Sequence, residues 1–163
     1  MTMARKESIR VAPYGIARKG NLYFAYGANM AVRDMRKRCP GATLLGTAKL
    51  CNWRFQIARE GFATVVSDPG KTVFGTLWRL TLRDLRALDA YEEIDRGVYI
   101  RAKIDFRPRR GAGVPGIIYI TANAGPGRPQ WRYIRGIVES APRFKFPAAY
   151  LRELSKWGAP ADW

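Results

Sequence analysis

Residues 22–30, which read Leu-Tyr-Phe-Ala-Tyr-Gly-Ala-Asn-Met, constrain the fold more than any other stretch of this chain. The aromatic and apolar run has the character of a β-strand that stops at Gly27, and the helix-favouring residues 31–38 follow, with Asn29 placed to cap a helix. The pattern therefore predicts a strand, a tight turn and a helix start. Such a turn directs the backbone N–H groups of Gly27, Ala28 and Asn29 toward one point, which suits a carboxylate or a developing oxyanion. An ordinary strand-to-helix connection is the simpler interpretation of the same residues.

The composition is that of a globular protein. The 163 residues are 47% hydrophobic and 26% charged. No apolar run approaches the roughly 18 residues that a membrane-spanning helix needs. We expect a soluble protein with one domain over residues 21–158, a flexible basic arm at residues 1–20 and a short tail at residues 159–163. The arm lacks the apolar segment of a secretory signal.

The chain has two cysteines and no histidine. Cys39 and Cys51 lack the spacing of a zinc site, so we interpret both as structural thiols, which fit a reducing, cytoplasmic compartment at least as well as a disulfide. The lack of histidine excludes catalytic systems of the Ser-His-Asp and Cys-His types and metal sites with histidine ligands. In an enzyme of this composition, a carboxylate, a tyrosine or a lysine must move the proton.

The net charge of +16, from 29 basic and 13 acidic residues, favours a polyanionic partner. Basic residues gather in four stretches of the chain: residues 5–19, 33–38, 101–110 and 128–145. No zinc-finger spacing, KH loop or RNP motif accompanies them, which makes nucleic acid a disfavoured partner and a solvated basic surface the simpler explanation. A nucleic-acid-binding protein is nevertheless the alternative to an enzyme, with Trp53, Trp131 or Trp163 as exposed aromatic residues on which bases would stack.

Four segments in the middle of the chain have the pattern of β-strands: residues 42–50, 52–58, 63–66 and 73–80. In the second of these, Trp53, Phe55 and Ile57 share one face. The strong turn signal Ser-Asp-Pro-Gly-Lys at residues 67–71 predicts that the last two segments form a hairpin.

A helix is predicted to begin after Thr81, which can cap it. Its apolar face carries Leu82, Leu85 and Leu88. At about 100° per residue the same face passes through Glu92, whereas Glu93 lies about a quarter-turn away, toward solvent. A carboxylate at the end of an apolar face is either desolvated or looks out of a cleft. Desolvation would raise its pKa, and repulsion from Asp89 would raise this pKa further. The alternative is that the helix frays before Glu92 and that the acidic residues form a solvated loop.

The remaining segments complete a mixed pattern of strands and helices. Residues 99–106 alternate like a strand with one wet face, residues 107–115 read as a basic loop, and residues 116–121 read as a short apolar strand. Two helices follow, at residues 129–141 and 147–157. We therefore expect an α+β fold, in which a small mixed β-sheet closes toward a barrel with flanking helices.

The sequence resembles the γ-glutamylcyclotransferase-like family in several blocks. Residues 23–30 resemble its Tyr-Phe-Ala-Tyr-Gly-Ser-Asn-Leu signature, and residues 63–78 are similar to a second block that carries Ala-Thr-Val, Pro-Gly and Val-x-Gly-x-Leu-Trp. Residues 88–99 resemble a third block, Leu-Asp-x-x-Glu followed by Gly-x-Tyr, and the end of the chain is similar to the two closing helices of the family. The resemblance spans residues 22–157.

This resemblance implies an enzyme without a cofactor that converts a γ-glutamyl amine into 5-oxoproline and a free amine by intramolecular aminolysis. It implies that Glu92 is the catalytic acid/base. It also implies a part in substrate binding for six residues: Tyr26, Gly27, Ala28, Asn29, Tyr119 and Tyr133. The resemblance does not identify the amine that is released.

Two positions depart from the family pattern, because Ala28 and Gln130 stand where serine is usual. Backbone donors in the turn survive the first change, whereas a hydrogen bond from the serine hydroxyl does not. A fold that is kept without activity, as a protein-interaction module, is therefore a further alternative. The expected partner is a small γ-glutamyl substrate and not a membrane, with an anionic molecule or an acidic protein as a second candidate.

Overall fold

A computed structural model describes residues 21–109 and 111–158. Its five strands are β1 (Asn21–Ala25), β2 (Thr43–Ile57), β3 (Ala63–Leu80), β4 (Ile100–Pro108) and β5 (Val114–Ile120). The longer helices are α1 (Val32–Arg38), α2 (Leu82–Tyr91), α3 (Trp131–Ser140) and α4 (Ala148–Trp157), and short 3-10 turns lie at Ala28–Met30, Ile94–Arg96 and Ala141–Phe144. The predicted arm and tail lie outside the described residues, so they stay predictions, as does the single domain.

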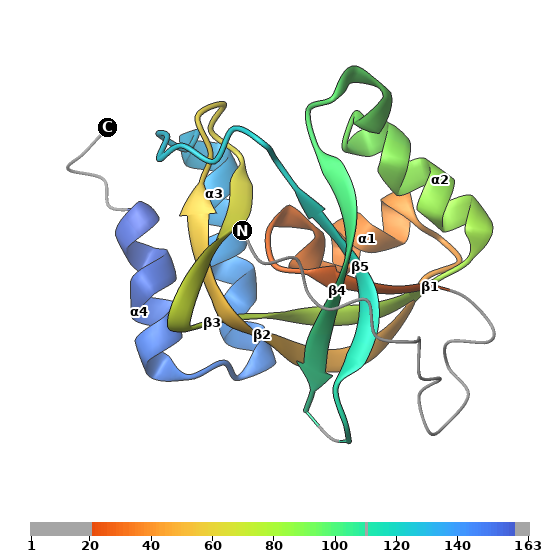
Figure 1. The fold of residues 1–163 in the computed structure, drawn as a ribbon, viewed down its shortest axis with the longest axis horizontal. Helices are drawn as coiled ribbons and strands as arrows, with labels where there is room; N and C mark the ends of the chain where they lie inside the picture. The colour runs from red at the N-terminus through yellow and green to blue at the C-terminus, as the bar shows by residue number, and fades with distance from the viewer. Residues whose placement is uncertain (1–20, 110, 159–163) are drawn as a thin grey trace.

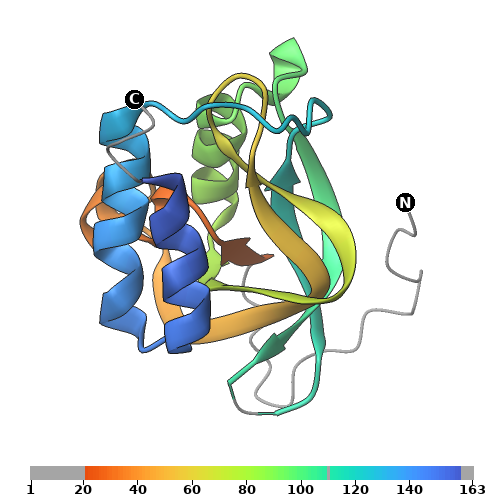
Figure 2. The same cartoon turned by 90° about the vertical axis from the view of Figure 1, so that its left-hand side faces the viewer.

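The strands form a closed barrel in the order β1-β3-β2-β4-β5. Neighbouring strands are antiparallel except at the closure, where β1 pairs in parallel with β5 at Tyr23 and Ile117. Figure 1 shows α1 and α2 at one side of the barrel and α3 and α4 at the other, and Figure 2 shows α3 and α4 side by side. The expected α+β fold with a mixed sheet that closes into a barrel is confirmed.

The predicted hairpin at residues 63–80 is wrong, because these residues form the single strand β3. The turn signal at residues 67–71 instead makes a bulge in the β2–β3 ladder: Trp53 pairs with Ser67 and Cys51 pairs with Thr72. Asn52 stands alone opposite the extra residues, with φ of 68°, and its side-chain oxygen accepts a hydrogen bond from the Gly70 N–H at 3.1 Å. Polar turn residues therefore bend the strand pair without reversing the chain.

The same bulge explains why two predicted strands, residues 42–50 and 52–58, are one strand, β2. The chain reverses between β2 and β3 at residues 58–62, where Ala58 donates a hydrogen bond to the carbonyl oxygen of Phe62 at 2.8 Å. The predicted face of Trp53, Phe55 and Ile57 is confirmed, because all three side chains are buried.

The other elements follow the predictions closely. β4 and β5 extend the predicted strands into the basic loop that was expected at residues 107–115, and α3 and α4 occupy the two predicted C-terminal helices. Cys39 is a buried free thiol and Cys51 an exposed one. The assignment of Trp53 as an exposed stacking residue is wrong, since only 7% of it is exposed; Trp131 is 48% exposed, and Trp163 lies outside the described residues. No helix within the described ranges is long and apolar enough to cross a membrane.

The predicted capping role of Asn29 is wrong. Helix α1 begins at Val32 with Ala31 as its N-cap, and no side chain caps it. The chain makes a short 3-10 turn at Ala28–Met30 before the helix, which moves Asn29 away from the N-cap position. The Asn29 side chain is buried and makes hydrogen bonds with Tyr23 and Arg38 instead.

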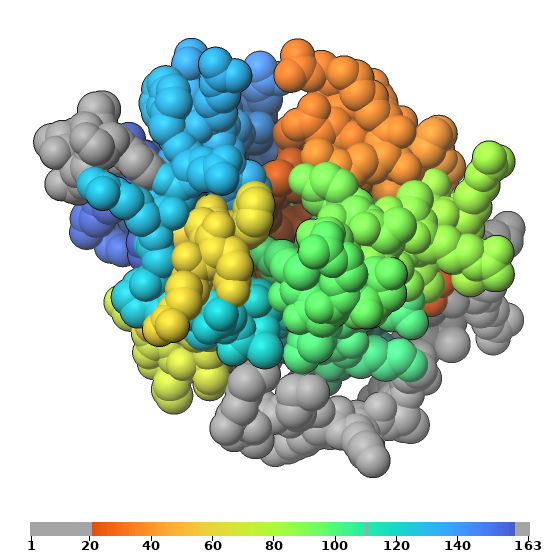
Figure 3. Space-filling model, turned by 90° about the horizontal axis from the view of Figure 1, so that it is seen from above, coloured from red at the N-terminus to blue at the C-terminus, as the bar shows by residue number. Residues whose placement is uncertain are grey.

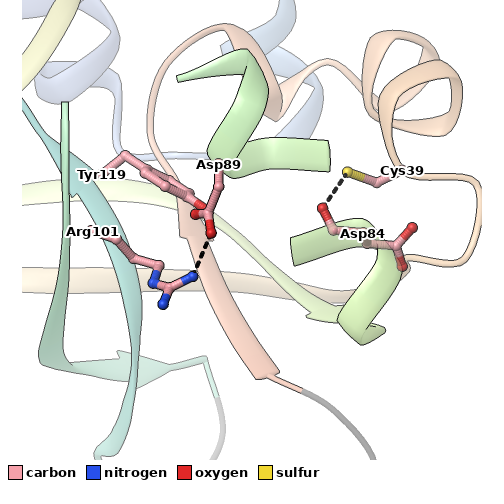
Figure 4. A network of polar contacts seen from close by, with 5 residues as sticks. All are labelled: Cys39, Asp84, Asp89, Arg101 and Tyr119. Carbon is pink, nitrogen blue, oxygen red and sulfur yellow. Dashed lines mark hydrogen bonds and ion pairs between the residues drawn. The ribbon is translucent and has the colours of Figure 1, made fainter. Parts of the chain in front are cut away.

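Thr81 caps α2 as predicted. The Thr81 hydroxyl accepts from the Asp84 N–H at 3.1 Å, and the Asp84 carboxylate accepts from the Thr81 N–H at 3.0 Å, which completes a capping box. This carboxylate is buried and also accepts from the Gly41 N–H at 3.1 Å. The Cys39 thiol lies 3.6 Å from the Asp84 carbonyl oxygen (Figure 4). Asp84 therefore joins the start of α2 to the chain that follows α1.

The apolar face of α2 is shorter than predicted. Leu85 and Leu88 are buried, but Leu82 is 59% exposed. Leu82 is the first residue of the helix and follows the N-cap residue Thr81 directly. The buried face of α2 begins about one turn after Leu82, at Leu85.

Replacing Asp84 with Ala should lower the free energy of unfolding by about 2 kcal/mol, because the change removes a helix cap and leaves the Gly41 N–H without its acceptor. The matched control is Asp105→Ala on the exposed face of β4, which should change stability by about 0.5 kcal/mol or less. Urea unfolding measures both values. Equal losses in the two variants would contradict the role given to Asp84.

Candidate active site

The structure brings the seven predicted site residues to one pocket of about 180 Å³. The lining includes Tyr26, Gly27, Ala28, Asn29, Glu92, Tyr119 and Tyr133. In Figure 3 the first described segment, in red, lies deep between α1 in orange, the β2–β3 connection in yellow and the segment after α2 in green. Residues that are far apart in the sequence, from Tyr23 to Tyr133, therefore meet in one hollow.

The turn at Gly27 sits against the first residue of β3. A Cβ atom at Gly27 would lie 3.2 Å from the Ala63 Cβ and 3.5 Å from the Tyr133 hydroxyl oxygen, so this position has little space for a side chain. The Gly27 carbonyl accepts from the Met30 N–H at 3.0 Å, which is the first hydrogen bond of the 3-10 turn. Within the described part of the chain, no hydrogen bond uses the N–H groups of Gly27, Ala28 or Asn29. These donors are thus available to a ligand.

Glu92 lies directly after the last turn of α2. Its N–H donates to the Leu88 carbonyl at 2.8 Å, so the helix does not fray before this residue and the alternative of a solvated loop is wrong. Burial raises the pKa of Glu92 from 4.5 to about 7, and the nearby Arg38 guanidinium opposes this increase. The expected contribution from Asp89 is wrong, because burial alone raises this pKa. Asp89 makes its contacts elsewhere.

Asn29 connects Glu92 to the positive charge of Arg38. The Asn29 side-chain N–H groups donate to the Tyr23 hydroxyl at 3.0 Å and, weakly, to Glu92 Oε1 at 3.4 Å. Its oxygen accepts from the Arg38 guanidinium, which also lies over the Tyr91 ring, 3.9 Å from the centroid. The guanidinium therefore acts on Glu92 from a distance and leaves the carboxylate open to the pocket.

Three tyrosine hydroxyls surround the backbone of Ala63. Tyr99 donates to its carbonyl oxygen at 2.6 Å, and Tyr133 accepts from its N–H at 2.9 Å. Tyr26 donates to the Tyr119 carbonyl at 2.6 Å and lies 3.4 Å from the Ala63 carbonyl. Because the Tyr133 oxygen accepts from the backbone, its own proton is available to a group in the pocket.

Tyr119 is held from outside the pocket. Its hydroxyl donates to Asp89 Oδ1 at 2.7 Å, and Asp89 Oδ2 pairs with Arg101 at 2.6 Å (Figure 4). The hydroxyl proton of Tyr119 is therefore used in the hydrogen bond to Asp89. The hydroxyl oxygen can accept a hydrogen bond from a ligand but has no second proton to donate. Tyr119 is 2% exposed, so it is at once a core aromatic residue and part of the pocket wall.

Glu93 differs from Glu92 although it also borders the pocket. Its backbone has φ of 51°, and its carboxylate pairs with Arg96 at 2.5 Å with 42% of the side chain exposed. The prediction that Glu93 faces solvent more than Glu92 is therefore confirmed. The Glu93 carboxylate is therefore a surface group that is screened by solvent and paired with Arg96, whereas Glu92 is buried.

The pocket leaves one candidate for a proton-transfer group. Burial raises the pKa of Tyr23, Tyr26, Tyr99 and Tyr133 well above the ordinary value, so these hydroxyls stay neutral near pH 7. The described lining contains no lysine. Glu92, with its pKa near neutral, is the group that can both lose and regain a proton under these conditions.

Several residues of the site were not among the predicted ones. Tyr23 and Tyr99 belong to motifs in the sequence, and their spacing gave a signal that could have identified them. Phe62 and Ala63 come from the connection between β2 and β3, and no local pattern marks them. In the described ranges no group of three or more His, Cys, Asp or Glu side chains could hold a metal ion.

Known proteins are similar to this chain in sequence and in fold. The AIG2-like family matches residues 72–154. Gamma-glutamylcyclotransferase of Mus musculus is 27% identical over 143 residues, which cover 82% of this chain and 76% of the mouse protein. The Homo sapiens protein of the same name is 25% identical over 143 residues, with the same shares of 82% and 76%.

The fold agrees with this match. A solved structure named gamma-glutamyl cyclotransferase is similar with a TM-score of 0.76 at 24% identity, covering 83% of this chain and 86% of that chain. At this identity the structural likeness shows a common fold and no more. The family match, which extends over half of the residues, and the shared fold lead to one conclusion. This chain belongs to the AIG2-like, or γ-glutamylcyclotransferase, family.

Proposed function

We propose that this protein is a γ-glutamyl cyclotransferase, which converts a γ-glutamyl amine into 5-oxoproline and a free amine with Glu92 as the acid/base. The observation that carries the proposal is a buried carboxylate with a pKa of about 7 in the same pocket as the free amides of the Gly27 turn. The mouse and human relatives bear the name of this activity, which supports the same reaction class.

The reaction needs few chemical groups. The α-amine of the substrate attacks its own γ-carbonyl carbon, so the nucleophile is already tethered and proximity supplies much of the acceleration. The bond from the γ-carbonyl carbon to the leaving nitrogen breaks after the ring bond forms. The protein must hold the folded-back substrate, accept a proton from the ammonium group and deliver one to the leaving nitrogen.

Glu92 can perform both proton transfers in turn. As a carboxylate it accepts a proton from the substrate ammonium, and as a carboxylic acid it donates this proton to the leaving amine. A pKa of about 7 keeps both forms populated near neutral pH, which is the condition under which one group serves as base and acid. The Tyr119 oxygen, which can only accept, is suited to orient the ammonium group before the transfer.

The amides of Gly27, Ala28 and Asn29 are suited to stabilise the carbonyl oxygen as it becomes negative. These donors belong to the backbone, so the absence of a serine hydroxyl at residue 28 does not remove them. Gln130 is the N-cap of α3, makes no side-chain cap hydrogen bond and is not part of the pocket lining. Neither departure from the family pattern therefore removes a group that the proposed reaction requires.

The size of the pocket favours recognition of the glutamyl group alone. At about 180 Å³ it is smaller than the roughly 300–1,000 Å³ of sites that enclose a whole drug-sized ligand. The amine would extend past Phe62 and Tyr91, which are 38% and 46% exposed at the edge of the pocket. Incubation with a panel of γ-glutamyl amines, followed by mass spectrometry for 5-oxoproline, tests the function and identifies the amine. No 5-oxoproline from any member would contradict the proposal.

Glu92→Gln should lower kcat/KM by about 10²–10⁴-fold, because glutamine keeps the shape of the side chain but transfers no proton. Glu93→Gln is the matched control and should stay within about twofold of the wild type, since Glu93 is exposed and paired with Arg96. Steady-state kinetics with the best amine of the panel measures both values. Similar losses in the two variants would contradict the assignment of Glu92.

Activity should rise with pH through a midpoint of about 7, because Glu92 acts first as a base and must begin as a carboxylate. Arg38→Gln should move this midpoint to higher pH, since the guanidinium lowers the pKa of Glu92 and the glutamine does not. The pH dependence of kcat/KM in the wild type and the variant measures the shift. A midpoint that stays unchanged or moves to lower pH would contradict this role of Arg38.

The same pKa has a consequence for stability. The native state binds the Glu92 proton more tightly than the unfolded chain does, so the free energy of unfolding should fall as pH rises from about 4.5 to about 7. Glu92→Gln removes this penalty and should gain up to about 3 kcal/mol over the wild type between pH 5 and pH 8.5. Urea unfolding at both pH values measures the gain, and Glu93→Gln should show no comparable change. A constant difference between Glu92→Gln and the wild type would contradict the burial of a charged Glu92.

A further inference from the structure

Side chains from α2, β4 and β5 meet at Asp89. Arg101 on β4 and Tyr119 on β5 are cross-strand partners, so their side chains lie on the same face of the sheet. Asp89 on α2 contacts both, because its Oδ1 accepts from the Tyr119 hydroxyl at 2.7 Å and its Oδ2 pairs with Arg101 at 2.6 Å (Figure 4). Tyr119 lines the pocket of Glu92, whereas Asp89 and Arg101 are not among the lining residues. Asp89 is therefore connected to the pocket through Tyr119.

We propose that Asp89 is a positioning residue for the α-ammonium group of the substrate. By taking the hydroxyl proton of Tyr119, it leaves the Tyr119 oxygen as an acceptor for this group, and Arg101 holds Asp89 in place. The proposal rests on the proposed function, because it requires a γ-glutamyl substrate in the pocket. It gives a part in substrate recognition to two side chains that do not line the pocket.

The direction of the Tyr119 proton depends on Asp89. A phenol hydroxyl has one proton and rotates to suit its partner, and a carboxylate can only accept. A hydrogen bond to a charged acceptor is stronger than one between neutral groups, so the Tyr119 proton stays with Asp89. A hydroxyl that turned its proton into the pocket would face the N–H groups of the ammonium with a donor. It would therefore weaken binding of the substrate.

Tyr133 has the opposite polarity in the same pocket. Its oxygen accepts from the Ala63 N–H at 2.9 Å, so its proton is available to a ligand, whereas the proton of Tyr119 is not. The head group of a γ-glutamyl substrate carries an ammonium, which donates, and a carboxylate, which accepts. It needs both kinds of partner, and in each tyrosine the protein group bound to the hydroxyl decides which kind is offered.

The position of Asp89 places the Tyr119 oxygen on the side of the pocket that carries Glu92. Asp89 stands three residues before Glu92, so the two side chains project from the same side of α2, with Cβ atoms about 5–6 Å apart. An ammonium group that gives one N–H to Glu92 can therefore give a second to Tyr119. Tyr26 and Tyr99 also donate their protons, but to backbone carbonyl groups away from α2.

A purely structural bridge between α2 and the sheet is the competing explanation. The Asp89 and Arg101 side chains are 28% and 40% exposed, and an ion pair at this exposure contributes little to stability. The two explanations also differ in what they predict. A bridge affects every ligand of the pocket alike when it is broken, whereas a positioning residue affects only ligands that carry the ammonium group.

The test is isothermal titration calorimetry on Glu92→Gln as the parent protein, which should bind substrate without turnover. The two probes are L-γ-glutamylethylamide and the monoethylamide of glutaric acid, which lacks only the α-ammonium group. Asp89→Asn should weaken binding of the first probe by about 10- to 100-fold and of the second by at most about twofold. Asparagine has a single acceptor oxygen, which Arg101 takes because it can only donate, so the amide N–H groups turn toward Tyr119 and reverse its hydrogen bond.

Two further variants separate the proton of Tyr119 from the ion pair. Arg101→Gln is the matched control, since it breaks the same ion pair but leaves a carboxylate that accepts from Tyr119, and both probes should stay within about threefold of the parent. Tyr119→Phe removes the oxygen itself and should lose the preference for the first probe. In the Tyr119→Phe background, Asp89→Asn should have no further effect on this preference. Circular dichroism checks that each variant is folded.

Four results would overturn the proposal: equal losses for the two probes in Asp89→Asn, an equal loss in Arg101→Gln, an unchanged preference in Tyr119→Phe, or additive effects of the substitutions at residues 89 and 119. A parent that binds L-γ-glutamylethylamide no more tightly than the monoethylamide would also overturn it. Production of 5-oxoproline by the wild type tests the enzymatic function separately. When the wild type forms 5-oxoproline, any of these results contradicts the role of Asp89 and leaves the enzymatic function standing.

Discussion

The arrangement of this protein depends on the way that β1 closes the barrel. β1 is only five residues long, yet it pairs with β3 along its whole length and meets β5 at Tyr23. Four of its five residues are buried, and both of its edges meet another strand, so the direction in which the end of β1 points is fixed. The turn that follows at Gly27 therefore opens between the start of β3, at Ala63, and the end of β5, at Tyr119. The backbone amides of this turn take their position from the closure of the sheet.

The same closure explains the cluster of tyrosines. Tyr26, Tyr99 and Tyr133 come from distant parts of the chain, and all three contact the backbone of Ala63. Ala63 begins β3, so its N–H and carbonyl groups face the pocket at the point where the strand pairing with β2 ends. Side-chain hydroxyls replace a neighbouring strand as hydrogen-bond partners there, since buried backbone groups need partners. The same tyrosines therefore pack against the core and form part of the polar lining of the pocket.

The sequence predicted the parts of the site that depend on local periodicity. The helical spacing of Leu85 and Leu88 placed Glu92 on the buried side of α2 and Glu93 nearer to solvent, and the structure agrees because α2 keeps its helical hydrogen bonds up to Glu92. The sequence could not predict what depends on contacts between distant segments. The bulge opposite Asn52 has the residues of an ordinary turn, and only the pairing of β2 with β3 decides that the chain bends there without reversing its direction. Asn29 likewise has the type of a helix cap, but Tyr23 and Arg38 offer its side chain better partners inside the fold.

The charge of +16 and the chemistry of the pocket belong to different parts of the molecule. The described pocket lining holds two acidic residues and no basic one, and Arg38 reaches Glu92 only through Asn29. A guanidinium in direct contact with Glu92 would hold its pKa low and leave it permanently ionised, whereas burial with only a remote cation leaves it near 7. The protein can carry this excess of positive charge and still keep the pKa of Glu92 near 7 only because the cations lie outside the described pocket lining.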